Sequence, residues 1–344
     1  MNNIELAAKI LSHYREKVNP EMTHYYGIIA SIGLVGMTEV DSEYLPLLRE
    51  VLGAFPDNVK HPRYNFPSYR VGGIAKARAV FDGFIEGRDG ELREYAEELM
   101  TAKRSADGVI SMPWDGGERK IWIDVATAAT PFLLFAGLRL DERRYIDEAV
   151  FQTLTMYDIF RDETNQLLHQ ARGFCDGDET FMKISDDHWS RGNGWGIYPL
   201  SMLCEFLPAE HPEKLRCEAY FKAHAEALRS FISPRGLWRQ EITSDRTGSY
   251  DETSGSGLIL AALATGIRLG LLDDSWKPIV ENGLSALIAY SVGEDGSTNH
   301  SCPGCLCPGD GSVEAYLTHR PSFKDEPHGA GPVILALVEA AKLK

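Results

Sequence analysis

The chain has 344 residues, of which 44% are hydrophobic and 25% are charged, a composition typical of a soluble globular protein with a large core. Its 35 lysine and arginine residues are outnumbered by 50 aspartate and glutamate residues, which gives a formal net charge of −15. Because so acidic a surface repels phosphate groups, we expect neither nucleic acid nor an anionic membrane as a partner.

The first segment, MNNIELAAKILSHYREKV, is predicted to form an amphipathic helix over residues 3–18, because Ile4, Ala7 and Leu11 follow helical spacing. It lacks the basic start and the unbroken apolar stretch of a signal peptide. No run of about 18 apolar residues occurs in the chain, so no membrane-spanning segment is predicted. We therefore expect a cytoplasmic protein with reduced cysteines.

Helix-length apolar periodicity recurs along the whole chain, and about twelve segments show it. The predicted helices span residues 3–18, 24–36, 43–55, 70–86, 89–103, 120–137, 141–162, 193–206, 211–231, 252–270, 274–291 and 326–343. No change of composition and no low-complexity linker separates them. Residues 1–344 are therefore predicted to form a single domain.

The predicted helices alternate in character along the chain. Some, such as GIIASIGLVGM (27–37), are apolar almost throughout, whereas others, such as DGELREYAEELMTAK (89–103), carry a charged face. A helix that is apolar all round is buried, and one with a charged face is peripheral. Alternating inner and outer helices predict six hairpins of roughly 57 residues each. We expect an all-α fold, an (α/α)6 toroid, with an open solenoid as the alternative.

In a closed double ring the loops that enter the inner helices gather at one end and can line one pocket. The segment MTHYYGIIAS opens the first inner helix, and its His24, Tyr25 and Tyr26 are candidates for this mouth. They could supply hydroxyl groups and a flat ring to a ligand. Ordinary packing at the start of a helix is the alternative.

Asp124 is the only charged residue between Ile121 and Gly137, a stretch predicted to lie in an inner helix. A buried carboxylate must be paired, hydrogen-bonded or protonated, because burial of an unpaired charge is costly. Burial also raises the pKa of a carboxyl group, which suits a general acid near neutral pH. A carboxylate stabilised by the dipole at a helix start is the alternative.

His169, in LLHQARGF, precedes a loop rich in aspartate and glycine. This position makes it a candidate for the mouth of the ring. A lone histidine is more often structural than functional, and that remains the competing interpretation.

The stretch DDHWSRGNGWGIYPL places two tryptophans and an arginine around two glycines that permit turn conformations. Arg191 offers a planar fork that matches a carboxylate. Trp189 and Trp195 offer flat faces on which a sugar ring can stack. A helix is predicted to begin near Trp195 with Asn193 or Ser190 as its cap, and a capped helix with two core tryptophans is the alternative.

Two later segments are predicted to lead into inner helices. GLWRQEITSDRTGSYDETSGSG is expected to form a short hairpin followed by a helix start, at which Glu252 is a candidate cap. In FKDEPHGAGPVILALVEAAK, Asp325 is a candidate N-cap and Pro327 would lie in the first turn. His328 would then face the mouth, unless it is an ordinary exposed first-turn histidine.

The chain has six cysteines, and Cys302, Cys305 and Cys307 lie together in HSCPGCLC. This pattern is similar to half of a structural zinc site, which usually needs a second pair of ligands. No such second pair is evident in the sequence. The pattern favours a loop with free thiols, with a metal site as the alternative.

Four motifs together resemble a known family. IWIDVATAATPFLL, WSRGNGW, GLWRQ with SYDETSGSG, and DEPHGAGPVILA occur in the order and spacing of unsaturated glucuronyl and rhamnogalacturonyl hydrolases. These are the six-hairpin glycosidases of glycoside hydrolase families 88 and 105, and the chain looks more similar to the second. The resemblance extends from about residue 24 to the end.

This resemblance implies an (α/α)6 catalytic domain that hydrates the C4=C5 double bond left by polysaccharide lyases on a terminal uronic acid. It implies that Asp124 is the catalytic acid, and that Arg191, Trp195 and His169 match the substrate-binding arginine, tryptophan and histidine. No metal or organic cofactor is implied. The expected partner is a small rhamnogalacturonan-like oligosaccharide, bound by a monomer or homodimer.

The chain departs from the family pattern in two places. The family commonly carries a second aspartate before an earlier inner helix, where YNFPSYRVGG offers Asn65 and Ser68. The usual His-Lys pair before the catalytic aspartate is replaced by Asp115, Arg119 and Lys120 in another arrangement. A divergent branch that acts on a different unsaturated disaccharide or a related uronoside is therefore expected.

Two other functions compete with this one. An (α/α)6 enzyme could cleave a saturated glycoside with a carboxylate pair, for example Asp124 with Asp187 or Glu252. Alternatively, a helical-repeat protein could bind carbohydrate without catalysis. Disappearance of the ultraviolet absorbance of the double bond distinguishes the first function from both.

Overall fold

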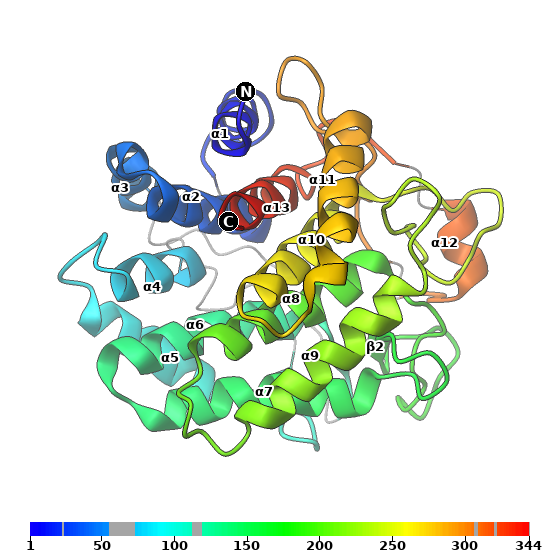
Figure 1. Ribbon diagram of the computed structural model, residues 1–344. Helices are drawn as coiled ribbons and strands as arrows, with labels where there is room; N and C mark the ends of the chain where they lie inside the picture. The colour runs from blue at the N-terminus through cyan, green and yellow to red at the C-terminus, as the bar shows by residue number, and fades with distance from the viewer. Residues whose placement is uncertain (23, 55–72, 112–118, 306–308, 320–321, 344) are drawn as a thin grey trace.

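The structure is a computed structural model that describes residues 1–22, 24–54, 73–111, 119–305, 309–319 and 322–343. Figure 1 shows its helices arranged as an inner ring with an outer layer around it. The colours follow one another around the ring, so neighbours in the sequence are also neighbours in space.

Six helices of the described chain form the inner ring. They are α2 (His24–Val40), α4 (Gly73–Phe81), α6 (Asp124–Leu140), α8 (Ser190–Phe206), α10 (Thr253–Arg268) and α13 (Ala330–Ala341). Each packs against the next in this order, and α13 packs against α2, so the ring is closed. The predicted (α/α)6 toroid is confirmed, and the open solenoid is wrong.

Six further helices within the described ranges cover the ring from outside. They are α1 (Asn3–His13), α3 (Leu45–Ala54), α5 (Asp89–Met100), α7 (Arg143–Phe160), α9 (Lys214–Arg229) and α11 (Lys277–Ser291). In α5 the buried residues are Leu92, Tyr95, Ala96 and Leu99, which share one helix face. In α6, by contrast, every residue from 125 to 137 is buried, as expected for a helix surrounded by others.

Glycines allow the last inner helix to approach its two neighbours closely. A Cβ atom on Gly331 would lie 2.8 Å from the Ile29 side chain and 2.9 Å from the backbone nitrogen of Ala30. A Cβ atom on Gly257 would lie 2.7 Å from the backbone of Pro332. These distances are too short for any larger residue, so the closure of the ring depends on glycine at both positions.

Ion pairs join the carboxyl ends of the inner helices. Glu39 at the end of α2 accepts hydrogen bonds from Arg78 of α4 at 2.6 Å and from Lys342, just after α13, at 2.7 Å. The Arg78 guanidinium also lies 4.9 Å from the Phe135 ring of α6 and 4.2 Å from the Phe206 ring of α8. Cations are favoured here because the carboxyl ends of helices carry partial negative charge.

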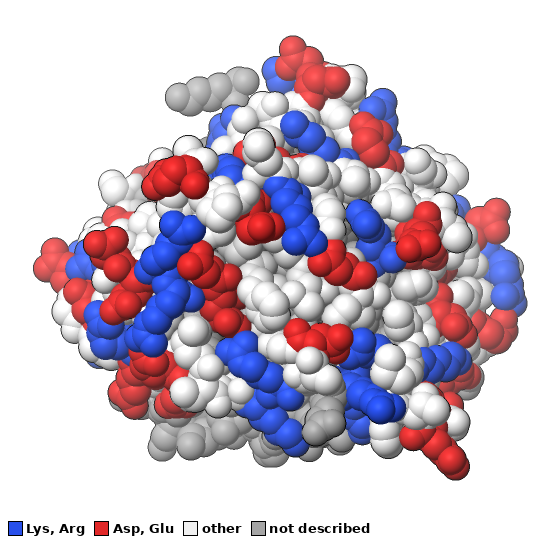
Figure 2. Space-filling model, turned by 90° about the horizontal axis from the view of Figure 1, so that it is seen from below, with Lys and Arg blue, Asp and Glu red and all other residues white. Residues whose placement is uncertain are grey.

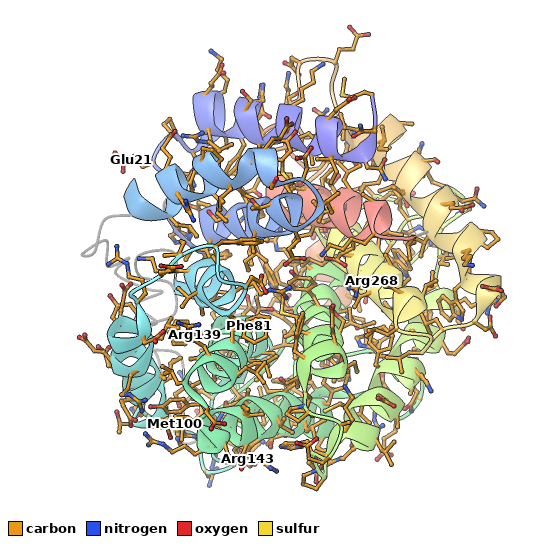
Figure 3. All side chains as sticks on the ribbon, turned by 60° about the vertical axis from the view of Figure 1, so that its left-hand side comes forward. Glu21, Phe81, Met100, Arg139, Arg143 and Arg268 are labelled. Carbon is orange, nitrogen blue, oxygen red and sulfur yellow. The ribbon has the colours of Figure 1, made fainter. Side chains whose placement is uncertain are left out.

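Arg268 at the end of α10 completes this network. It donates to Glu205 of α8 at 2.8 Å and to Glu339 of α13 at 3.1 Å. Figure 3 labels Arg268 and Phe81, which lie near the middle of the ring at this end. The ion pairs at this end therefore link neighbouring inner helices to one another.

The structure contains elements that the apolar pattern did not predict. Helix α12 (Val313–His319) lies outside the two rings, at the right of Figure 1. Strands β1 (Ile121–Trp122) and β2 (Ala171–Arg172) form an antiparallel ladder. Both elements are too short to show a periodic signal in the sequence.

The predicted caps of α8 are wrong. The helix begins at Ser190 with Trp189 as its N-cap, which makes no side-chain cap bond. Asn193 lies inside the helix, where its side-chain amide binds the backbone of Leu168 on both sides, at 2.8 and 3.0 Å. Gly194 is helical and allows close packing, because a Cβ atom there would lie 2.8 Å from Leu258. This glycine therefore serves packing rather than a turn.

The predicted start of the last helix is also wrong. Helix α13 begins at Ala330 with Gly329 as its N-cap, so Asp325 does not cap it and Pro327 precedes its first turn. The Asp325 side chain instead accepts a hydrogen bond from the backbone of Thr298 at 3.1 Å and pairs with His13 at 3.1 Å. These contacts with residues distant in sequence occupy the carboxylate, so it is not available as a cap.

Acidic and basic side chains are interspersed over the surface shown in Figure 2. None of the helices in the described residues is long and apolar enough to cross a membrane.

The packing at Gly331 predicts that Gly331→Ala destabilises the fold, because the added methyl group would meet the backbone of α2. We expect the free energy of unfolding to fall by about 1–3 kcal/mol in chemical denaturation. Gly90→Ala is the control, because a methyl group added to this exposed helical glycine would have nothing within 4 Å. Equal stabilities of the two variants would contradict the role of Gly331.

Candidate active site

The amino ends of the inner helices meet at the end of the ring opposite the ion-pair network. The Tyr25 hydroxyl of α2 contacts His328, which lies just before α13. The Ser190 hydroxyl of α8 donates to Glu252 at the start of α10, at 3.2 Å. The start of α2 therefore contacts the segment before α13, and the start of α8 contacts the start of α10.

Asp124 is the first residue of α6, directly after the short β1–β2 ladder. The ladder fixes the backbone before it, and the backbone N–H of Ile123 donates to Gln170 at 3.0 Å. The Oδ2 atom of Asp124 is buried and has no hydrogen-bond partner among the described residues. Burial raises the pKa of Asp124 to about 6, against the lowering effects of Arg191 and of its own backbone N–H. This carboxyl group therefore exchanges its proton close to neutral pH.

Arg191, the second residue of α8, is 1% exposed and has unused donors. One of its nitrogens, Nη1, donates to the Ser254 hydroxyl at 2.9 Å and to the Cys302 carbonyl at 2.6 Å. Its Nε and Nη2 atoms have no hydrogen-bond partner within the described part of the chain. A buried guanidinium held on one side, with two donors unused, is suited to binding an anion.

The two tryptophans beside Arg191 occupy different positions. Trp189 is 2% exposed, and its ring lies 4.5 Å from the Arg191 guanidinium carbon, so it supports the arginine from behind. Trp195 is 4% exposed, and its ring meets the edge of Tyr25 at a centroid distance of 6.4 Å. Trp195 therefore joins α8 to the aromatic residues of α2.

The candidates of α2 and α13 form one aromatic cluster. The His24 ring stacks on Tyr26 at 4.2 Å, and Tyr26 meets His328 edge-on at 5.0 Å. His328 Nδ1 lies 2.7 Å from Glu326, a carboxylate that the sequence pattern did not single out. Burial, and then the charge of Arg191, lower the pKa of His328, against the raising effect of Glu326. Half-buried Tyr26 and His24 leave part of the cluster accessible.

Glu252 is fully buried, and both of its oxygens are occupied. It caps α10 by accepting from the backbone of Ser254 and Gly255 at 3.1 and 2.6 Å, which confirms the predicted cap. It also accepts from the backbone of Cys302 at 2.9 Å and from Ser190. The preceding hairpin is confirmed, since residues 238–240 and 250–252 are joined by backbone hydrogen bonds. Glu252 therefore fixes the walls of the mouth.

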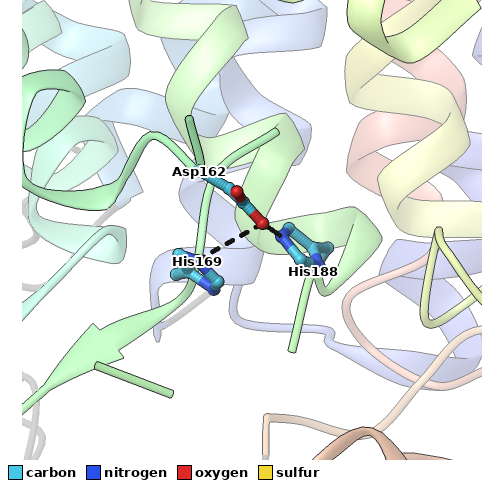
Figure 4. Close-up of side chains that lie close together, drawn as sticks. All are labelled: Asp162, His169 and His188. Atoms are coloured by element: carbon cyan, nitrogen blue, oxygen red, sulfur yellow. Dashed lines mark hydrogen bonds and ion pairs between the residues drawn. The ribbon is translucent and has the colours of Figure 1, made fainter. Parts of the chain in front are cut away.

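His169 lies in a second cluster, with Asp162 at the end of α7 and His188 before α8 (Figure 4). The Asp162 Oδ2 atom is 3.0 Å from His188 Nε2 and 3.8 Å from His169 Nε2. Sequence reasoning missed Asp162 and His188, because neither interrupts an apolar stretch. Within the described residues these three have the spacing to share a metal ion.

Buried groups behind the mouth adjust its charge. Burial raises the pKa of Asp187 to about 7, and nearby Glu241 raises it further, against the hydrogen bond of Ser185. Burial, and to a smaller extent the charge of Asp124, raise the pKa of the Cys305 thiol. Within the described residues, Cys175, Cys204, Cys217, Cys302 and Cys305 form no disulfide.

Some predicted features lie outside the described residues. These are Asn65, Ser68, Asp115 and Cys307. Arg119 and Lys120 are described and lie just before β1. The Arg119 side chain donates to the backbone of Thr180 at 3.0 Å, and the Lys120 amine lies 5.0 Å from the Phe181 ring.

The arrangement combines a carboxyl group that can hold a proton with a cation that can hold an anion. Asp124 is near enough to Arg191 for the guanidinium charge to lower its pKa. Such a pair can bind an acidic ligand and transfer a proton to it.

Sequence comparisons identify relatives that are named for their activities. The model of the family described as Glycosyl Hydrolase Family 88 matches residues 28–344. An unsaturated 3S-rhamnoglycuronyl hydrolase from Formosa agariphila is 30% identical over 213 residues, which are 60% of this chain and 54% of that protein. One from an Alteromonas species is 34% identical over 146 residues, 41% of this chain and 33% of that protein. The chain thus spans about half, or less, of these curated relatives.

Solved structures share the fold over almost the whole chain. A glycoside hydrolase of family 105 from C. acetobutylicum superposes with a TM-score of 0.83 at 22% identity, covering 100% of both chains. An unsaturated glucuronyl hydrolase from Bacillus sp. GL1 superposes with a TM-score of 0.72 at 15% identity, covering 99% of this chain and 95% of that one. The identities are low, so the likeness shows a common fold.

The pairing of charges predicts that Arg191→Met raises the pKa of Asp124 above its value of about 6, because a positive charge near a carboxyl group favours its ionised form. A carbon-13 NMR titration of the aspartate carboxyl groups would measure this change. Arg246→Met is the control, since this arginine forms an exposed pair with Glu314. An unchanged pKa of Asp124 in Arg191→Met would show that the Arg191 charge does not act on Asp124.

Proposed function

This chain belongs to glycosyl hydrolase family 88, and we propose that it hydrates the C4=C5 double bond of a terminal unsaturated uronic acid. Its substrates are small oligosaccharides produced by polysaccharide lyases, and the reaction releases the uronic acid from the next sugar. The proposal is supported above all by Asp124, whose pKa of about 6 lets it act as an acid beside Arg191.

Asp124 is the proton donor in this reaction. Its carboxyl group gives a proton to C4 of the enol ether while water adds to C5, and the resulting carboxylate takes a proton from that water. The hemiketal formed at C5 then opens, and the glycosidic bond breaks to release the aglycone. Proton donation needs a carboxylic acid that survives near neutral pH, which burial provides here.

Arg191 binds the carboxylate of the uronic acid. The buried Nε and Nη2 atoms of Arg191 are unused within the described residues and can form two parallel hydrogen bonds to a carboxylate. The backing by Trp189 and the bonds to Ser254 hold the guanidinium in place before the substrate arrives. Trp195, His24, Tyr26 and His328 form the sugar-binding wall, and His169 binds substrate from the α7 side.

The sugar next to the uronic acid is rhamnose-like in this proposal. The support comes from the two curated relatives, both named unsaturated 3S-rhamnoglycuronyl hydrolases. In this proposal the protein works in the cytoplasm, as a monomer or homodimer. The described cysteines form no disulfide, which is consistent with a reducing compartment.

Hydrolysis of a saturated glycoside by a carboxylate pair is less well supported. Glu252 cannot serve as the second carboxylate, because five hydrogen-bond donors already occupy its oxygens. Asp187 is buried, and its pKa of about 7 leaves about half of it protonated at neutral pH, whereas a nucleophile or base must be charged.

Asp124→Asn should abolish turnover while the fold is kept, because the amide cannot donate the required proton. We expect kcat to fall by at least about 10²–10⁴-fold. The rate is measured as the loss of the ultraviolet absorbance of the double bond in lyase-treated rhamnogalacturonan. Asp274→Asn is the control, at an aspartate whose side chain is 89% exposed. A fully active Asp124→Asn enzyme would reject the proposed role.

The pH dependence follows from the pKa of the acid. Asp124 must be protonated, so activity should be retained below its pKa and lost as the pH rises through about 6. The measurement is kcat/KM against pH on the same oligosaccharides, in buffers of constant ionic strength. A rate that increases from pH 5 to pH 8 would mean that Asp124 acts instead as a base.

A further inference from the structure

His188 lies between two carboxylates. Its side chain is 8% exposed, and its Nε2 atom is 3.0 Å from Asp162 Oδ2. Its Nδ1 atom is 3.6 Å from Glu241 Oε1, and the same carboxylate oxygen accepts the His188 backbone N–H at 2.9 Å. Since Glu241 is fully buried, the imidazole is held from behind by a charge that water does not screen.

Asp162 is fixed in the direction of the two histidines. Its Oδ1 atom accepts from the backbone and hydroxyl of Thr164 at 2.8 and 2.7 Å. Its Oδ2 atom accepts from Asn165 at 3.1 Å and faces His188 and His169 (Figure 4). A carboxylate with this many partners cannot rotate away, so the arrangement is preorganised.

The pKa values of the two histidines shift in opposite directions although their ring centres are 4.6 Å apart. Burial lowers the pKa of His188, but the charges of Glu241 and Asp162 and the hydrogen bond to Asp162 outweigh it and raise the pKa above its usual value. Burial lowers the pKa of His169, and the positive charge of His188 lowers it further, against Asp162. The backbone of Asp187 and the charge of Asp186 also act on His169, and both raise its pKa.

We propose that His188 is a positioning residue, whose positive charge, held by two carboxylates, keeps the neighbouring His169 ring neutral and available to a ligand. A neutral imidazole can accept a hydrogen bond from a sugar hydroxyl, whereas an imidazolium can only donate. The relevance to turnover rests on the proposed function, in which His169 binds substrate. The charges proposed for His188 and His169 do not depend on the proposed function.

A metal ion shared by Asp162, His169 and His188 is the competing explanation of the cluster. The Asn165 amide donates to Asp162 Oδ2 at 3.1 Å, and its nitrogen lies 3.3 Å from His188 Nε2, so it occupies the space between two of the three groups that would bind the ion. The Asn165 amide and Thr164 together provide the Asp162 carboxylate with hydrogen bonds to both oxygens without a metal. The observed contacts therefore favour a hydrogen-bonded network.

The test is His188→Gln, which retains a side-chain donor for Asp162 and removes the charge. We expect the pKa of His169 to rise by about one unit, as measured by nitrogen-15 NMR of the imidazole rings. The acid limb of kcat/KM on unsaturated oligosaccharides should move to higher pH by the same amount. His211→Gln is the matched control, because His211 is also buried against an aspartate, 2.9 Å from Asp147, but lies outside the mouth.

Wild-type protein provides a second measurement that needs no variant. At pH 7 the ring nitrogens of His188 should show an imidazolium, and those of His169 a neutral ring. A neutral His188, or an unchanged pKa of His169 in His188→Gln, would overturn the proposal. So would one equivalent of zinc in the purified wild-type protein that is lost in His188→Gln. If the wild type leaves unsaturated oligosaccharides intact, the proposed function fails, while NMR still decides the charge states.

Discussion

The closure of the inner ring between its first and last helices is the constraint on which the site depends. Helix α13 reaches α2 closely enough only because Gly331 leaves room for the α2 backbone. Once the ring closes, the starts of α2, α6, α8 and α10 and the residues before α13 surround one mouth. An open arrangement would separate His328 from Tyr25, which now touch.

The two ends of the ring use charge in opposite ways. At the carboxyl end, Glu39, Arg268 and their neighbours are paired with one another, so they stabilise the closed ring and leave little for a ligand. At the amino end, Asp124 and Arg191 keep buried polar atoms without partners in the described residues. Unpaired buried groups cost stability, and those of Asp124 and Arg191 support the proposed binding site at the amino end.

The carboxyl groups at the mouth differ in role because they differ in surroundings. Glu252 accepts five hydrogen bonds and serves as a structural anchor. Asp162, with four close partners, directs two histidines. Asp124 has a buried, unused oxygen, and burial raises its pKa. Carboxyl groups thus differ in pKa and in hydrogen bonding through their surroundings, which supports the different roles proposed for them.

The helices and the alternation of inner and outer layers could be predicted from the amino-acid sequence, because apolar periodicity is visible in one dimension. Asp124 could be singled out as an isolated charge in an apolar stretch and Arg191 as an arginine between two tryptophans, and their roles are proposals. The starts of α8 and α13 could not be predicted, since Asn193 and Asp325 bind distant backbone groups instead of capping. The grouping of Asp162, His169 and His188, which come from the two loops on either side of β2, also emerged only in three dimensions. Such contacts depend on tertiary packing, and no local pattern encodes them.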